Sequence, residues 1–291
     1  MLKSFDYTEL NNPEFKEDAV KEELITPLLK ALGYDYNGRF KIIRSRRLNH
    51  PFNMIGSQKH NVSIIPDYIL ECDGKSVCVI DAKSPSKNLN DERYIGQVYS
   101  YAVHREVSAK FFALCNGREF VLYETGFLNP KMTFYMKYIG SHFQDLEYII
   151  GNKNILASSK SGIKKDLGIH LKMLFAGNHR VKLFFYDLPI SQIALVEPNI
   201  YTVDSNIVFN EEEYCGSFDF SYELLLQIEH LLPNDSLEKL RDITKIPIVV
   251  EFAGKRFVVG IECELGDKIY ENINEQYMPL KITGFSYAEW R

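Results

Sequence analysis

The sequence predicts an α/β fold for the first half of the chain and a smaller α+β domain for the second half. Three observations support this prediction. A stripe of apolar residues at helical spacing opens the chain, two hairpin patterns with a helical pattern between them follow, and strand patterns are lost between Tyr138 and Gly177. We therefore expect domains at residues 1–150 and 181–291, with a linker or helical connection over 151–180.

The composition is that of a globular protein with reduced cysteines. The chain has 291 residues, 45% hydrophobic and 25% charged, which is enough to bury a sizeable core in one or two domains. No stretch reaches signal-peptide length or the roughly 18 apolar residues of a membrane span. The five cysteines are dispersed without a CxxC pair, so we expect reduced core thiols, no disulfide framework and no zinc site. A cytoplasmic protein without membrane contact is expected.

The first element is a helix over residues 13–32. Pro13 fits the first turn, apolar residues recur every three or four positions from Val20, and Gly33 is suited to ending the helix. Counting back along the apolar stripe from Val20 reaches Glu17, which we expect at the buried edge. The alternative is that Glu17 is only a favourable first-turn charge near the helix dipole.

A basic segment follows this helix. No acid occurs over residues 36–66, whereas the first half as a whole has 19 basic and 19 acidic residues and the second half 15 and 20. Such a segment suits contact with a phosphate backbone, and the alternative is a solvated loop. The candidate nucleic-acid-binding residues are Arg39, Lys41, Arg44, Arg46, Arg47 and Lys59.

Two apolar strands within residues 64–83 form the next pattern, joined at Asp73-Gly74. Asp67 lies at the start of the first strand and Asp81 near the end of the second. A two-residue turn alone would place these acids on opposite faces, because strand side chains alternate. A longer loop or a β-bulge would set Asp67 opposite Asp81, and a shared site requires one of the two.

A helix is then expected over residues 91–104, capped by Asn90, with Gln97 and Tyr101 on one side because they are four residues apart. Another hairpin is expected around Asn116-Gly117. For the second half, we expect strands over 181–186, 200–209, 246–252 and 257–263, a turn at Gly254-Lys255 and a helix over 220–232.

The acids and the lysine of the hairpin suggest phosphodiester chemistry. Burying a carboxylate costs several kcal/mol unless a cation or hydrogen bonds compensate it. Mg²⁺ prefers oxygen ligands and retains waters, so Asp67, Asp81 and the carbonyl of Ala82 would suffice to hold it. Lys83 would orient or deprotonate a water, or stabilise the transition state. The alternatives are that Asp67 is a turn former and that Lys83 is an exposed cation paired with Asp81.

Pro66-Asp67 followed by Asp81-Ala82-Lys83 resembles the PD-(D/E)xK nuclease motif. The preceding helix with Glu17 and the Gln97-x-x-x-Tyr101 helix extend the resemblance to the N-terminal nuclease domain of type I restriction enzyme R subunits, which is similar to RecB-like nucleases. The resemblance covers roughly residues 10–150. It implies a restriction-endonuclease-like core, in which a mixed central sheet is flanked by helices.

The resemblance also implies roles for these residues. Glu17 would assist the metal site, Asp67 and Asp81 would bind the metal, Lys83 would be the catalytic lysine, and Gln97 and Tyr101 would stabilise the site and contact the nucleic-acid backbone. The alternative for Tyr101 is an ordinary core aromatic. The chain lacks a GxxxxGK[ST] loop, so we expect no ATP site.

The leading expectation is a Mg²⁺-dependent endonuclease, with Mn²⁺ as a substitute, that cleaves duplex DNA in restriction or defence. A homodimer is expected, because cutting both strands commonly needs two active sites. One alternative is a non-catalytic nuclease-fold module that binds nucleic acid or a partner protein. Another keeps the chemistry but directs it to RNA, branched DNA or modified DNA.

Overall fold

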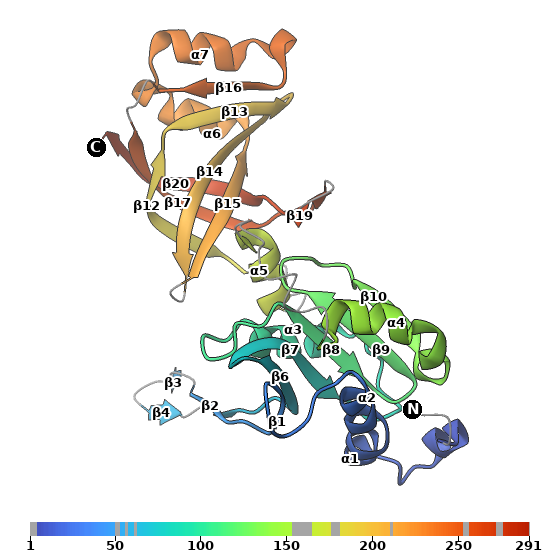
Figure 1. Cartoon of the computed structure of the whole chain (residues 1–291). Helices are drawn as coiled ribbons and strands as arrows, with labels where there is room; N and C mark the ends of the chain where they lie inside the picture. Colours follow the sequence, from blue (N-terminus) through green and yellow to red (C-terminus); the bar gives the residue numbers. More distant parts are fainter. Residues whose placement is uncertain are drawn as a thin grey trace. The chain divides into compact units, whose positions relative to one another are not determined.

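The computed structural model describes residues 5–49, 53–55, 58–60, 63–152, 165–175, 181–209, 212–252, 256–271 and 276–290 (Figure 1). For residues 53–55, 58–60, 63 and 290, only the backbone is described. The chain divides into two compact units, Met1–Gly162 and Ile163–Arg291. The sequence placed this boundary at residue 150. Each unit is described by itself below.

The first unit is built on a six-stranded mixed sheet. The strand order is β1-β6-β7-β8-β9-β10, in which β7 and β8 are parallel and every other neighbouring pair is antiparallel. Helix α3, Glu92–Ala102, connects the two parallel strands and packs on them (Figure 1). The expected α/β class with a mixed sheet is therefore confirmed. The strands are β1 Phe40–Arg44, β6 Tyr68–Cys72, β7 Lys75–Ala82, β8 Phe111–Cys115, β9 Glu119–Glu124 and β10 Met132–Tyr135.

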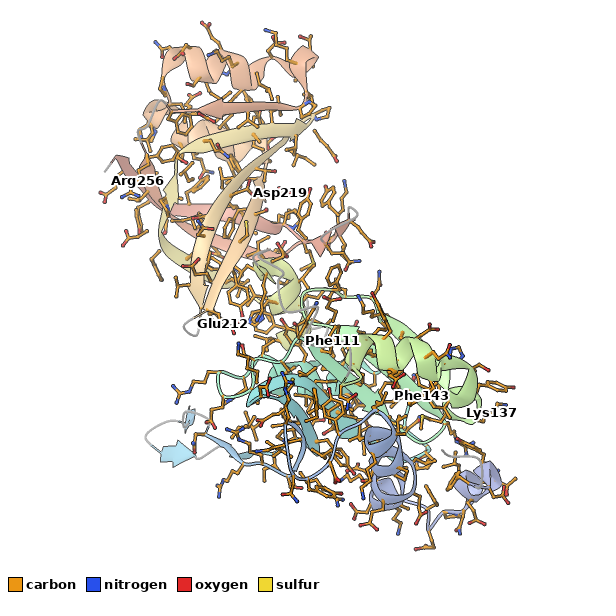
Figure 2. The ribbon with its side chains drawn as sticks, in the orientation of Figure 1. Phe111, Lys137, Phe143, Glu212, Asp219 and Arg256 are labelled. Carbon is orange, nitrogen blue, oxygen red and sulfur yellow. The ribbon has the colours of Figure 1, made fainter. Side chains whose placement is uncertain are left out.

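The predicted first helix is present, although it begins at Glu17 and ends at Ala31. It consists of α1 (Glu17–Val20), a π-helical segment (Lys21–Ile25) and α2 (Thr26–Ala31). Gly33, with φ of +89°, follows its end as expected. The apolar stripe of this helix and α4 (Ile139–Ile150) pack with one face of the sheet, where Phe111 of β8 is buried (Figure 2).

The hairpin of β6 and β7 contains the β-bulge that a shared site requires. Asp73 and Gly74 both have positive φ, at 51° and 77°, and form a tight two-residue turn. Beyond the turn the ladder shifts by one residue at Val77, so that Tyr68 pairs with Ile80. Of the two predicted possibilities, a longer loop or a β-bulge, the structure contains the β-bulge.

Other local expectations need correction. Asp91 rather than Asn90 caps α3, since the Asp91 side chain accepts a hydrogen bond from the backbone N–H of Arg93 at 3.0 Å. The basic segment, for which a solvated loop was the alternative, contains strand β1. This strand pairs antiparallel with β6 and forms one edge of the sheet. The hairpin at Asn116-Gly117 is confirmed.

The second unit is built on an eight-stranded sheet. Its order is β12-β17-β20-β15-β14-β13-β16, with β11 beside β15. Strand β14 has the predicted bounds, and the predicted helix over 220–232 corresponds to α6 and the 3₁₀ turn that follows. Strands β13, β15 and β20 and helix α7 were not predicted. The predicted turn at Gly254-Lys255 lies outside the described residues.

The elements of the second unit are β11 Lys165–Asp166, α5 Leu167–Leu174, β12 Leu183–Ile190, β13 Gln192–Glu197, β14 Ile200–Phe209, β15 Glu212–Phe220, α6 Tyr222–Ile228, α7 Asn234–Arg241, β16 Ile248–Glu251, β17 Phe257–Leu265, β18 Tyr270–Glu271, β19 Gln276–Tyr277 and β20 Leu280–Trp290. The first unit also contains short strands β2 Leu48–Asn49, β3 Asn53–Ile55, β4 Gln58–His60 and β5 Ser63–Ile64. Among the described residues, the 3₁₀ turns are Tyr7–Asn11, Met136–Tyr138, Glu229–Leu231 and Ile243–Lys245. No helix in the described part of the chain combines the length and apolar character needed to cross a bilayer.

Candidate active site

The start of β6 and the end of β7 bring Asp67 and Asp81 into neighbouring positions. Because Tyr68 pairs with Ile80, continuing the ladder by one residue sets Asp67 opposite Asp81. The backbone N–H of Ala82 donates a hydrogen bond to Oδ2 of Asp67 at 2.8 Å. The β-bulge therefore produces the juxtaposition that the motif needs, and the carboxylate of Asp67 is fixed at the carboxyl end of β7.

Lys83 lies beside Asp81 in a buried position. Asp81 is 5% exposed and Lys83 8% exposed, and the ammonium of Lys83 donates to the Asp81 carboxylate. It also donates to Oε1 of Gln97 at 3.1 Å and lies 5.0 Å from the ring centroid of Tyr94. Of the alternative for Lys83, the pairing with Asp81 is present, but the side chain is buried rather than exposed.

Helix α3 contributes the two residues that its spacing predicted. Gln97 and Tyr101 project from the same side, and Nε2 of Gln97 donates to the hydroxyl of Tyr101 at 2.7 Å. Oε1 of Gln97 accepts from Lys83, so the polar network runs from Asp81 to Tyr101. The helix thus orients the strand-end ammonium from above the sheet face.

Glu17 joins the site through a residue that the sequence analysis missed. Nζ of Lys21 lies 2.8 Å from Oδ1 of Asp67 and 3.0 Å from Oε1 of Glu17, so it connects the first helix to the hairpin. The i,i+4 spacing of Glu17 and Lys21 is visible in the sequence and could have indicated their pairing. The contact with Asp67 has no local signal, because the two residues are far apart in the chain.

The acids of this site interact electrostatically. The pKa of Asp81 is raised to about 6, chiefly by burial; Lys83 opposes this increase, and the charges of Asp67 and Glu17 add to it. Burial also raises the pKa of Tyr101, and the negative charges of Asp81 and Asp67 add to this increase. For Lys21, burial alone would lower the pKa, but hydrogen bonds to Asp67 and Glu17 outweigh it and raise the pKa. Three carboxylates and two ammonium groups therefore lie close together at the end of β7.

The donor set fits a magnesium ion by its chemistry. Asp67, Asp81 and the Ala82 carbonyl offer oxygen atoms alone, and Mg²⁺ is commonly held by one or two carboxylates with several waters. Among the residues that the structure describes, no group of three or more His, Cys, Asp or Glu side chains is arranged to hold a metal ion. A third acidic ligand would have to come from Glu17, whose carboxylate is paired with Lys21.

The basic segment is divided by β1. Arg39 forms hydrogen bonds with both carboxylate oxygens of Asp73 at the turn of the hairpin, roughly 20 Å along the strand from Asp67 at about 3.3 Å per residue. Lys41, opposite Glu71, is also nearer the turn than the site. The turn end of the segment therefore lies away from the site, and contact of the segment with a phosphate backbone stays a prediction.

The other end of β1 lies at the site. Arg44 pairs with Tyr68 in the ladder, and the backbone N–H of Ser45 donates to the carbonyl of Asp67 at 3.1 Å. Arg46 is engaged by Glu71 at 3.3 Å and Glu106 at 3.7 Å. Arg44 and Arg47 are exposed, and no ion pair involves either of them within the described residues. The side chain of Lys59, on β4, lies outside the described part of the structure.

Comparison with models of known protein families gives no match, and comparison with curated proteins gives none either.

Proposed function

We propose that the first unit is a Mg²⁺-dependent endonuclease that hydrolyses DNA phosphodiester bonds, in restriction or defence against foreign DNA. The observation that carries this proposal is the convergence of Asp67, Asp81 and Lys83 at the carboxyl end of β7, with Gln97 hydrogen-bonded to the lysine. These are the residues of the PD-(D/E)xK motif, and the mixed sheet with its β7–α3–β8 crossover supports the restriction-endonuclease-like core.

Each residue has a distinct part in this mechanism. A bound Mg²⁺ would neutralise phosphoryl charge and lower the pKa of a water ligand, and Asp67, Asp81 and the Ala82 carbonyl would hold it. Lys83 orients the attacking water or neutralises charge that develops on the phosphoryl oxygens. Gln97 fixes the direction of the Lys83 ammonium through the 3.1 Å hydrogen bond, and Tyr101 in turn fixes Gln97. Glu17 adds negative charge beside Asp67.

Plasmid cleavage tests the proposal directly. Supercoiled DNA is incubated with the full chain in Mg²⁺, in Mn²⁺ and in EDTA, and nicked and linear products are measured. We expect products with either metal, none in EDTA, and none with Asp81→Asn. The matched control is Asp145→Asn, because Asp145 is an exposed acid on α4 of the same unit. Cleavage by Asp81→Asn at the wild-type rate would refute the assigned site.

A non-catalytic module that binds nucleic acid or a partner protein is the second candidate. The observation that favours it is the pairing of Asp81 with Lys83 and of Asp67 with Lys21, since each carboxylate already has an ammonium partner. This candidate predicts salt-dependent DNA binding without metal-dependent cleavage.

For the proposed nuclease, duplex DNA is the expected substrate, and parallel assays with RNA and branched DNA distinguish the remaining substrate classes. The expected homodimer is tested by light scattering with and without DNA.

A further inference from the structure

Lys21 is surrounded by carboxylates. Its Nζ lies 2.8 Å from Asp67, 3.0 Å from Glu17 and 3.4 Å from Asp18, and its side chain is 18% exposed. An ordinary surface pair in the same unit differs, since Lys16 and Glu14 are 68% and 81% exposed at 3.4 Å. The contacts of Lys21 with Asp67 and Glu17 are closer and better shielded from water, so they are weakened less by solvent.

The backbone of Lys21 is fixed at the same place as its side chain. Lys21 begins the π-helical segment, and its carbonyl accepts from the backbone N–H of Thr26. The same carbonyl accepts from the hydroxyl of Tyr68 at 3.0 Å, the residue that follows Asp67. The side-chain ammonium and the backbone carbonyl of Lys21 thus both contact residues at the start of β6, and this holds the ammonium beside Asp67.

The oxygen atoms that bind Lys21 are among those expected to bind the metal. Oδ1 of Asp67 and Oε1 of Glu17 face the ammonium, while Oδ2 of Asp67 is occupied by the Ala82 N–H. An ammonium and a divalent cation repel each other strongly at such short range. Each of the two cations therefore weakens the binding of the other at these carboxylate oxygens.

We propose that Lys21 is an internal counter-ion of the site, which holds Glu17 and Asp67 together without metal and is displaced when a divalent cation binds. This inference rests on the proposed function, because it takes the same carboxylates as metal ligands. Lys21 is then a positioning residue that sets the metal affinity of the site. It keeps the acids in place without metal and opposes metal entry.

The affinity for Mn²⁺ tests this inference without measuring activity. Mn²⁺ is titrated into the full-length protein, with the free ion followed by electron paramagnetic resonance. Because Lys21→Met removes the competing charge, we expect its Mn²⁺ affinity to increase about tenfold, whereas Lys21→Arg stays close to wild type. Lys16→Met is the matched control and should leave the affinity unchanged. An unchanged or weaker affinity in Lys21→Met would overturn the inference.

A second measurement uses the wild-type protein, so that it does not depend on the folding of a variant. The side-chain ¹⁵N resonance of Lys21, assigned by its loss in Lys21→Arg, is followed during Mg²⁺ titration. We expect it to shift to the position of an exposed lysine. An unchanged resonance at saturating Mg²⁺ would also overturn the inference.

If Lys21→Met binds Mn²⁺ more tightly but no DNA is cleaved, the inference stands and the nuclease function fails. If DNA is cleaved and the variant binds Mn²⁺ like wild type, the inference alone fails.

Discussion

Lys83 donates a hydrogen bond to Oε1 of Gln97 at 3.1 Å and thereby joins the end of β7 to the face of α3. The ammonium is also paired with Asp81, so it is held from the strand and from the helix at once. A lysine fixed in this way is already oriented before substrate binds. Preorganised charge of this kind is most effective where a site excludes water.

Replacing Lys83 by Met should therefore abolish most of the activity. We expect plasmid cleavage to fall at least about 100-fold, as is common when a group that moves a proton or stabilises developing charge is lost. The measurement is the initial nicking rate at saturating Mg²⁺. Lys75→Met is the matched control, because Lys75 is exposed at the opposite end of the same strand. Equal losses in both variants would indicate damage to β7 and contradict a specific role for Lys83.

The raised pKa of Asp81 predicts how stability depends on pH. Folding raises this pKa from 3.8 to about 6, so the folded state binds the proton more tightly than the unfolded state does. Stability should decrease as the pH rises from about 4 to about 6 and then level off, by at most about 3 kcal/mol.

Asp81→Asn should remove this part of the pH dependence, since an amide does not titrate. The difference in unfolding free energy between wild type and variant is measured in EDTA, by hydrogen exchange on peptides covering residues 68–82. The wild type should lose stability relative to the variant between pH 4 and pH 6. A constant difference over that interval would show that Asp81 is not held in a buried environment.

Much of this site could be predicted because its signals are local. Side-chain alternation places Asp81 and Lys83 on one face, and helical spacing places Gln97 beside Tyr101. A longer loop or a bulge could be inferred only from the assumption that Asp67 and Asp81 share a site, because the two-residue turn at Asp73-Gly74 by itself would place them on opposite faces.

The residues that were missed depend on contacts between distant parts of the chain. The contact of Lys21 with Asp67 arises only when the first helix packs beside the hairpin. The pairs of Arg39 with Asp73 and of Arg46 with Glu71 depend on β1 lying next to β6. Strand β1 was not predicted, because its charged residues interrupt the apolar pattern of a strand. In the second unit, register shifts interrupt the pairing of β17 with β20, which weakens the period-two pattern from which a strand is recognised.

The position of β1 predicts that the basic segment contributes unequally to DNA binding. Arg44 lies at the site end of β1 and Arg47 follows it in the chain, whereas Arg39 is engaged by Asp73 at the turn. The double variant Arg44→Ala and Arg47→Ala should weaken binding to duplex DNA and reduce the dependence of log K on log salt by up to about 2, one for each lost phosphate contact.

Fluorescence anisotropy in EDTA at several salt concentrations measures this effect without cleavage. Arg39→Ala is the matched control, and we expect its affinity to match wild type although its hairpin turn loses an ion pair. If Arg39→Ala weakens DNA binding as much as the double variant does, DNA does not approach at the carboxyl end of β7.

In the second unit, His170 of α5 predicts a separate response to acid. Its ring is buried 4.4 Å from the ring of Tyr214, and Lys165, paired with Glu212 (labelled in Figure 2), is near it. The pKa of His170 is lowered from 6.5 to about 4, chiefly by burial, with a smaller contribution from the charge of Lys165 that Glu212 partly opposes. The unfolded state therefore binds the proton more tightly, and the stability of this unit should fall as the pH drops from about 6.5 to about 4.

His170→Gln should remove this loss, which amounts to at most about 3 kcal/mol, because its amide does not titrate. Urea unfolding followed by tryptophan fluorescence measures it, since Trp290, the only tryptophan, lies on β20 of this unit. His230→Gln is the matched control, because His230 is exposed on the same unit. The same loss of stability in wild type and in His170→Gln would contradict the prediction, since the acid-sensitive group would then lie elsewhere in the unit.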